Sequence, residues 1–161
     1  MKNKILLTAL VLMVIAVITS GVWYKNKKQF DPSVNPRTFK TAAEFENFYK
    51  NLEEVYKNDT YGGATPEETL QLFIDALKKG DTDLAVKYFI PEKQKEEGEK
   101  LRIGKEKNNL DFLLGFLEKA GYGKQIREGV YQMAVAQDGK AIMSFDFVLN
   151  KYTSKWKIES I

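Results

Sequence analysis

The first pattern along the chain is an uncharged apolar run that begins at Ile5 and ends at Tyr24. A helix rises about 1.5 Å per residue, so a run of this length spans about 30 Å, the thickness of the hydrocarbon core of a bilayer. Trp23 and Tyr24 stand where interfacial aromatic residues are common, and lysines follow at once. The pattern predicts that residues 1–28 form an uncleaved transmembrane anchor with basic flanks.

The flanks of this run bear on its processing and its orientation. Ser20 and Gly21 are small residues near a plausible cleavage position, so a cleaved secretory signal is the alternative to an anchor. Lys2 and Lys4 nearly balance the three lysines on the other side, and short charged N-terminal tails commonly stay in the cytoplasm. We therefore expect a single-pass protein with its domain on the extracytoplasmic side.

A polar linker is predicted between the anchor and the domain. Residues 29–40 contain Pro32 and Pro36 and show no sustained hydrophobic period. The domain is then expected to occupy residues 41–161.

Helical periodicity with explicit start signals marks the first half of the domain. Thr41 and Glu44 form a capping box, and Thr65 precedes Pro66 at a second start. Three further helical segments are expected: a short one from residue 82, a densely charged one over residues 92–107 and a leucine-rich one over residues 110–117.

From Lys124 onward the hydrophobic period changes to two, which is typical of strands. Asp138-Gly139 between two alternating runs predicts a two-residue hairpin turn that pairs Gln137 with Lys140. A second turn over residues 151–154 would pair Leu149 with Trp156 and Phe147 with Ile158. Counting from these turns predicts one core face, made of Val130, Gln132, Ala134, Ala136, Ala141, Met143, Phe145, Phe147, Leu149, Trp156 and Ile158.

The opposite face of the predicted meander carries Val135 and the polar residues Ser144 and Asp146 among further apolar residues. This face is too apolar for a solvated sheet, so either a helix of the chain or a second copy should cover it. The interface candidates for a homodimer through this outer face are Tyr131, Met133, Ile142 and Val148.

Two segments carry a resemblance to a known family. The helical stretch TPEETLQLFIDALKKGDTDLAVKYF and the terminal strand SKWKIESI resemble the nuclear transport factor 2-like superfamily, in particular its bacterial envelope members of unknown function. The resemblance covers about residues 62–161. It implies a curved antiparallel sheet wrapped around helices into a cone, often with an internal pocket and often dimeric. The expected fold class is therefore α+β, with an N-terminal transmembrane helix and then helices packed on a curved antiparallel sheet.

Four residues are candidates for a ligand pocket inside such a cone: Tyr88, Gln132, Phe145 and Trp156. Gln132 is the polar residue among apolar neighbours on the predicted core face, where it could orient a ligand. The hydroxyl of Tyr88 could serve the same purpose. The alternative for both is a structural role, in which backbone or water satisfies the polar group.

Composition and charge exclude several classes of function. The chain has 161 residues, 43% of them hydrophobic, and contains neither Cys nor His, which excludes thiolate nucleophiles, imidazole bases and the usual zinc sites. We expect no metal and no cofactor. Five of the 25 basic residues precede residue 29 and all 22 acidic residues follow it, which leaves 20 basic against 22 acidic residues in the rest. A nucleic-acid partner is not expected, because a nucleic-acid-binding domain would concentrate its basic residues on one face.

The function expected from these patterns is a membrane-anchored extracytoplasmic binding or interaction module without catalytic activity of its own. Its expected partners are the lipid bilayer, through Ile5 to Tyr24, and a small apolar ligand or an envelope protein. The alternative is a small cone-fold enzyme of isomerase or hydrolase type, using a carboxylate and a Tyr in an apolar pocket. An enzyme would need an ionisable group on the inner face, and the predicted inner face offers only Glu128 at its rim.

Removal of residues 1–28 should release a soluble, folded domain, because the apolar run lies outside the predicted core. Fractionation would locate the truncated chain, and circular dichroism would report its fold. Aggregation or persistent membrane association of the truncated chain would show that the apolar run is part of the fold.

Overall fold

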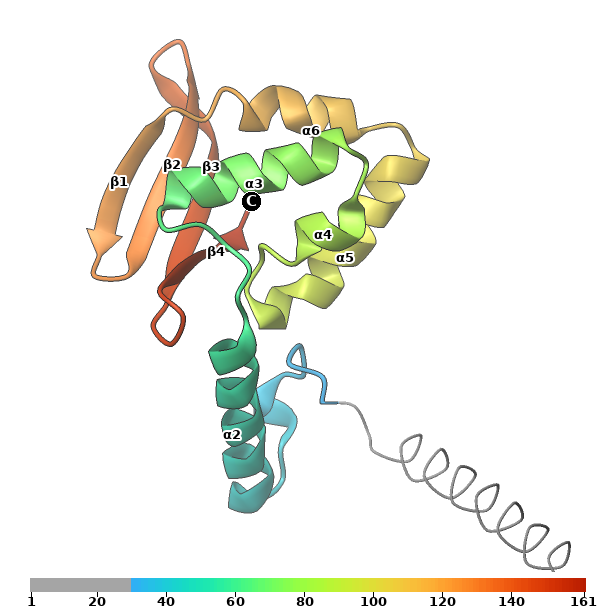
Figure 1. The fold of residues 1–161 in the computed structure, drawn as a ribbon, viewed down its shortest axis with the longest axis vertical. Helices are drawn as coiled ribbons and strands as arrows, with labels where there is room; N and C mark the ends of the chain where they lie inside the picture. The colour runs from blue at the N-terminus through green and yellow to red at the C-terminus, as the bar shows by residue number, and fades with distance from the viewer. Residues whose placement is uncertain (1–29) are drawn as a thin grey trace, which may run out of the picture. The chain divides into compact units, whose positions relative to one another are not determined.

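A four-stranded antiparallel sheet and five α-helices make up residues 30–161, the part of the chain that the computed structural model describes (Figure 1). The expected α+β class is confirmed, and the predicted anchor over residues 1–28 lies outside the described residues. In chain order the elements are η1 (Pro36–Thr38), α2 (Ala42–Asn58), α3 (Pro66–Lys78), α4 (Thr82–Val86), α5 (Pro91–Glu106), α6 (Leu110–Leu117), β1 (Tyr122–Arg127), β2 (Val130–Gln137), β3 (Lys140–Asn150) and β4 (Lys155–Ser160).

The helix starts follow the capping signals in the sequence. Thr41 accepts a hydrogen bond from the backbone N–H of Glu44, whose carboxylate reaches back to the backbone of Thr41, so the predicted capping box is confirmed. Thr65 caps α3 in the same way, with Pro66 in its first turn. Asp81 caps α4 by accepting from the N–H of Leu84. Local chemistry therefore sets where three of the helices begin.

The strands form a meander in the order β1-β2-β3-β4. Asp138 and Gly139 both have positive φ, at 53° and 74°, as a two-residue type I′ turn requires, and Gln137 pairs with Lys140 as predicted. The pairs of Phe147 with Ile158 and of Leu149 with Trp156 are also confirmed. The strand β1, which pairs with β2 beyond a turn at Gly129, adds a fourth strand to the three that the sequence predicted.

The predicted facing of β2 is wrong, because a bulge shifts its register with β3. Ala136 pairs with Ala141, but the next pair is Val135 with Met143, so Ile142 has no partner in the ladder. A shift of one residue turns every β2 side chain to the other face. Residues of β2 that were expected on the outer face therefore lie in the core, namely Tyr131, Met133 and Val135, whereas Gln132 lies on the outer face.

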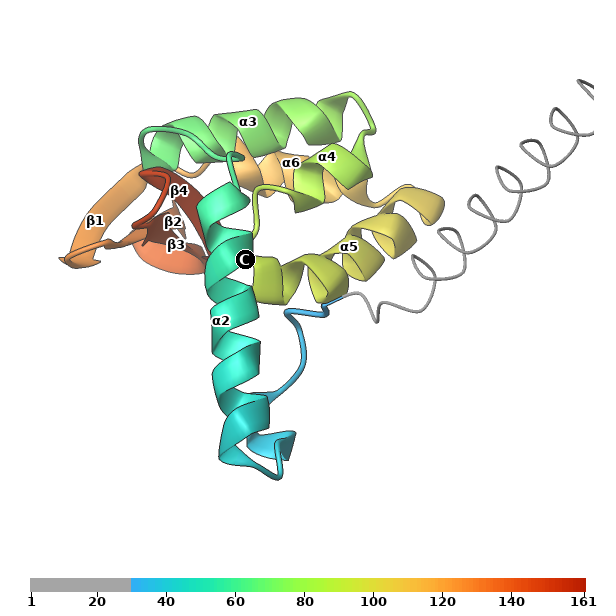
Figure 2. The same ribbon diagram turned by 60° about the horizontal axis from the view of Figure 1, so that its bottom comes forward.

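The core lies between α3 and one face of the sheet, and residues of α4, the α4–α5 connection, α5 and α6 complete it (Figure 2). Four phenylalanine rings in it are fully buried: Phe73, Phe89, Phe145 and Phe147. Phe73 and Phe89 meet edge to face, with ring centroids 5.4 Å apart. The interior is therefore filled by large side chains from both layers.

The helix α2 extends away from the core, and the segment of residues 31–41 runs beside it (Figures 1 and 2). Only Phe48 and Leu52 among the α2 side chains are buried hydrophobics. The ring of Phe39 packs on Phe48 with centroids 5.1 Å apart, which joins the segment to the helix. The rings of Phe45 and Tyr49 on α2 stay exposed.

The bulge gives a test of the β2 facing. Met133→Glu should destabilise the domain by about 3 kcal/mol or more, because Met133 is 5% exposed and the new charge would be buried without a partner. Ile142→Lys is the matched control on the next strand and should change stability by less than about 0.5 kcal/mol, because Ile142 is 48% exposed. Urea unfolding followed by circular dichroism measures both changes. Equal effects would contradict the observed register.

Candidate functional site

The four predicted pocket residues do not form a pocket. Tyr88 and Phe145 are buried in the core, at 7% and 0% exposed, and Trp156 is half-buried with its ring edge-on to Tyr131 at 6.3 Å between centroids. Gln132 lies on the opposite face, since the bulge in β3 reverses the facing of β2. The prediction that these residues share a core face is wrong for Gln132, and large rings fill the interior around the others.

The four predicted interface residues do not share a surface either. Met133 belongs to the core and Tyr131 packs against it, so both were wrongly assigned to the outer face. Ile142 is exposed at the bulge, and Val148 is half-buried beside α2. A homodimer through the outer face stays a prediction, with Ile142 as its most exposed apolar contact.

Polar side chains cross the outer face of the sheet. Gln132 of β2 donates a hydrogen bond to Asp146 of β3 at 2.8 Å, and Ser160 of β4 donates to the other carboxylate oxygen at 2.9 Å. The outer position predicted for Asp146 is confirmed. The outer face is therefore more polar than the sequence predicted, because Met133 and Val135 face the core and Gln132 faces outward.

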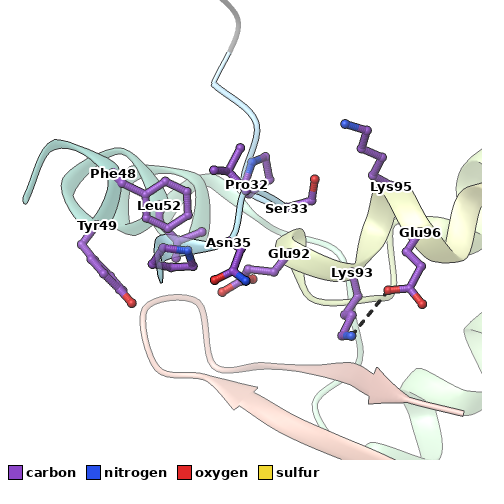
Figure 3. Close-up of a pocket in the computed structure, with 12 residues that line it drawn as sticks. Pro32, Ser33, Asn35, Phe48, Tyr49, Leu52, Glu92, Lys93, Lys95 and Glu96 are labelled. Atoms are coloured by element: carbon purple, nitrogen blue, oxygen red, sulfur yellow. Dashed lines mark ion pairs between the residues drawn. The ribbon is translucent and has the colours of Figure 1, made fainter. Parts of the chain in front are cut away.

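A cleft with a volume of about 570 Å³ lies between α2, the start of α5 and the segment before α2 (Figure 3). We call it the first cleft. Figure 3 shows the α2 side chains on one wall and those of α5 on the other, with the chain segment passing between them. The lining residues are Pro32, Ser33, Val34, Asn35, Pro36, Phe48, Tyr49, Leu52, Glu92, Lys93, Lys95 and Glu96.

A second cleft, of about 530 Å³, lies where α2 meets the turn between β3 and β4. It shares Tyr49, Leu52 and Glu92 with the first cleft, so the two clefts adjoin along α2. We call them together the α2 groove. The second cleft is lined by Tyr49, Leu52, Glu53, Tyr56, Ile90, Glu92, Val148, Leu149, Asn150, Lys151, Tyr152 and Glu159.

Aromatic rings stand exposed along the α2 groove. Tyr49 lines both clefts and is 45% exposed. Phe45, one helical turn before it, lines neither cleft but is 49% exposed, with its ring centroid 4.5 Å from that of Tyr49. Tyr152, in the turn between β3 and β4, is 40% exposed. Exposed rings beside an open groove are typical of binding surfaces, where Tyr supplies large contact area at low entropic cost.

A tyrosine and a carboxylate meet in the second cleft. The hydroxyl of Tyr56 donates to Glu92 at 2.7 Å, and Glu92 stands in the first turn of α5, where the helix dipole favours a negative charge. Burial raises the pKa of Tyr56 above its ordinary value, and the nearby charge of Glu92 raises it further. The phenol is therefore held protonated, as a hydrogen-bond donor.

Two lysines surround the ring of Tyr152. The ammonium groups of Lys57 and Lys151 lie 5.8 Å and 5.0 Å from its centroid, within cation–π distance. Lys57 also pairs with Glu53 at 2.9 Å, and this contact lowers the pKa of Glu53. The mouth of the second cleft thus combines an aromatic ring with charges of both signs.

Two further clefts lie outside the α2 groove. One, of about 430 Å³, is bounded by the end of α2 and by Tyr61, Lys87 and Gln94. The other, of about 390 Å³, lies between α3 and α6. None of these four clefts in the described chain is lined by Tyr88, Gln132, Phe145 or Trp156. The α2 groove is the candidate site because it joins the two largest of them to exposed aromatic rings.

The sequence contained a signal for the groove. Helical spacing places Phe45, Phe48, Leu52 and Val55 on one face of α2, and Tyr49 lies beside them and widens the apolar side. The structure buries only Phe48 and Leu52 of this set. An apolar stripe wider than a neighbouring element can cover indicates an exposed face.

Neither a metal site nor a membrane span is found in the described residues. Within residues 30–161, no group of three acidic, His or Cys side chains is arranged to hold a metal ion. No helix in the same range is long and apolar enough to cross a bilayer, and the run from Ile5 to Tyr24 lies outside it.

Comparison of the chain with protein-family models, with curated proteins and with solved structures finds no match.

The contact of Asp31, in the segment before α2, with Lys95 of α5 should weaken at acid pH. Asp31 accepts from Lys95 at 2.7 Å and from Ser33, and these hydrogen bonds lower its pKa to about 2 from 3.8. The stabilisation by this contact is therefore present above pH 3.8 and is lost as the pH falls through about 2. NMR titration of the Asp31 carboxyl measures this pKa directly.

Lys95→Met should return the pKa of Asp31 toward its ordinary value, because the first cause of the shift is removed. Lys100→Met is the matched control on the same helix, since Lys100 pairs with Glu96 and Glu97. A low pKa that persists in Lys95→Met would contradict the contact between the segment and α5.

Proposed function

We propose that the protein is a binding module, anchored in a membrane with its domain on the extracytoplasmic side, which recognises its partner through the α2 groove. The observation that carries this proposal is the exposure of Tyr49 and Tyr152 in an open groove, with Phe45 exposed next to Tyr49, beside an interior that is closed by buried rings. Large apolar patches are uncommon on the free surface of a domain, and where they occur they usually mark a site of interaction.

The anchor rests on the sequence. The apolar run from Ile5 to Tyr24 has bilayer length and basic flanks. The polar linker predicted over residues 29–40 would join such an anchor to the domain.

Kinship with the nuclear transport factor 2-like superfamily is part of this proposal. Its support is the antiparallel meander packed on α3, together with a first strand, β1, that extends the sheet. A cone-like curvature of this sheet is proposed from the same resemblance. The interior holds Phe73, Phe89, Phe145 and Phe147 where a pocket would lie, so binding at the outer groove is favoured over binding inside a cone.

The alternative, an enzyme with a carboxylate and a tyrosine, has one observation in its favour, the contact between Tyr56 and Glu92 in the second cleft. Each group satisfies the other, and the raised pKa of Tyr56 makes the phenol a poor proton donor to a substrate near neutral pH. Binding is therefore the better-supported function of the groove.

A photo-crosslinking amino acid in place of Tyr49 tests the proposal in the full chain, expressed in the cells that naturally make it. We expect discrete adducts from this position, because the ring of Tyr49 lines both clefts. Phe112 is the matched control, since it is a 73% exposed ring on α6 outside the groove. Absence of adducts at position 49, or equal adducts at both positions, would contradict binding at the α2 groove.

A further inference from the structure

The side chains that line the α2 groove indicate which chemical class of partner it would bind. This inference rests on the function proposed above. We infer that the groove binds an extended segment of another protein in which lysine or arginine side chains alternate with apolar ones. Three features of the groove support this inference: its apolar floor, the carboxylates in its wall and the way its exposed ring already holds ammonium groups.

The floor of the second cleft fits apolar side chains. Leu52 comes from α2, Ile90 precedes α5, and Val148 and Leu149 come from β3. Leu149 is 39% exposed even though its strand neighbour Phe147 is fully buried. Apolar side chains of a partner would remove this surface from water, at roughly 25 cal/mol for each Å² covered.

The charge of the second cleft favours a cation. Three carboxylates line it, from Glu53, Glu92 and Glu159, against the single ammonium of Lys151. Glu53 is already paired with Lys57, whereas Glu92 and Glu159 have no basic partner among the described residues. The charges of Glu92, Asp59 and Glu159 all act to raise the pKa of Tyr56, so the potential around its hydroxyl is negative.

The ring of Tyr152 shows which kind of group this wall attracts. The ammonium groups of Lys57 and Lys151 stand over this ring as a bound lysine would. Tyr49, on the facing helix, offers a second exposed ring with no ammonium group over it in the described structure. A basic side chain of a partner could therefore lie between Tyr49 and the carboxylates.

The form of the groove favours a protein segment over a membrane surface. The two clefts share Tyr49, Leu52 and Glu92, so a partner can continue from one cleft into the next around α2. A flat bilayer surface would contact the outer rings but would not enter both clefts. An extended chain alternates its side chains and can place apolar and basic groups in turn.

Two capped nonapeptides provide the probe, Ala-Lys-Leu-Lys-Ala-Lys-Leu-Lys-Ala and the same sequence with Glu for every Lys. Each is titrated by calorimetry into the full-length protein in nanodiscs of zwitterionic lipid, with empty nanodiscs as the reference. We expect the lysine peptide to bind at least about tenfold more tightly than the glutamate peptide, a difference of about 1.4 kcal/mol.

Variants place the binding in the groove. Tyr49→Ala should weaken binding of the lysine peptide by about fivefold and Glu159→Gln by about threefold. The matched controls, Phe112→Ala and Glu99→Gln, lie outside the groove and should leave the affinity unchanged. Circular dichroism of each variant verifies that the domain is folded.

Four results would overturn the inference. They are no binding of the lysine peptide, equal binding of both peptides, binding that the groove variants do not weaken, and equal binding to empty nanodiscs, which would indicate a lipid surface. If adducts still form at position 49 in any of these cases, the proposed function stands and only the partner chemistry is wrong. If the adducts are absent too, both proposals fail.

Discussion

The buried ammonium group of Lys157 is the contact on which the arrangement of α2 depends. Lys157 is fully buried on β4, and its ammonium pairs with Asp59 at 2.7 Å and donates to the carbonyl oxygens of Tyr61 and Lys87. Burial lowers its pKa, and the pairing with Asp59 opposes that shift. A buried charge is tolerated only when its donors are satisfied, so the end of α2, the loop after it and the residue after α4 are all held to one point of the sheet.

That point determines where the α2 groove lies. Beside Lys157, the backbone at Gly62 and Gly63 approaches β4 so closely that a side chain at Gly62 would overlap the carbonyl oxygen of Trp156. Asn150 adds a hydrogen bond to the carbonyl of Tyr56 at 2.8 Å. The C-terminal end of α2 is thus fixed to the sheet, whereas Phe45 and Tyr49, nearer its other end, stay exposed. Because α2 is fixed to the sheet at its C-terminal end, aromatic side chains nearer its N-terminal end can remain exposed.

Elements governed by local chemistry could be predicted from the sequence, and those governed by tertiary contacts could not. The caps at Thr41 and Thr65 and the turn at Asp138-Gly139 involve neighbouring residues, so their patterns were sufficient. The facing of β2 depended on a bulge at Ile142, which leaves no mark in an alternating sequence. The groove was missed for a related reason. Phe48 is buried and Phe45 is exposed, and this difference depends on which part of α2 the rest of the domain covers.

The reversal of β2 also explains why the candidate site lies outside the sheet. Had Gln132 faced inward, the core would contain an amide that required a partner or water, and Met133 would have been left outside. Met133 and Val135 instead face inward and pack in the same cluster as Phe145 and Phe147, which closes the interior. On the opposite face, Gln132 and Ser160 both donate hydrogen bonds to Asp146. The exposed rings of α2, Phe45 and Tyr49, lie outside this closed core. The binding proposed for the α2 groove therefore rests on the exposed rings of Tyr49 and Tyr152, and not on the rings that the sheet buries.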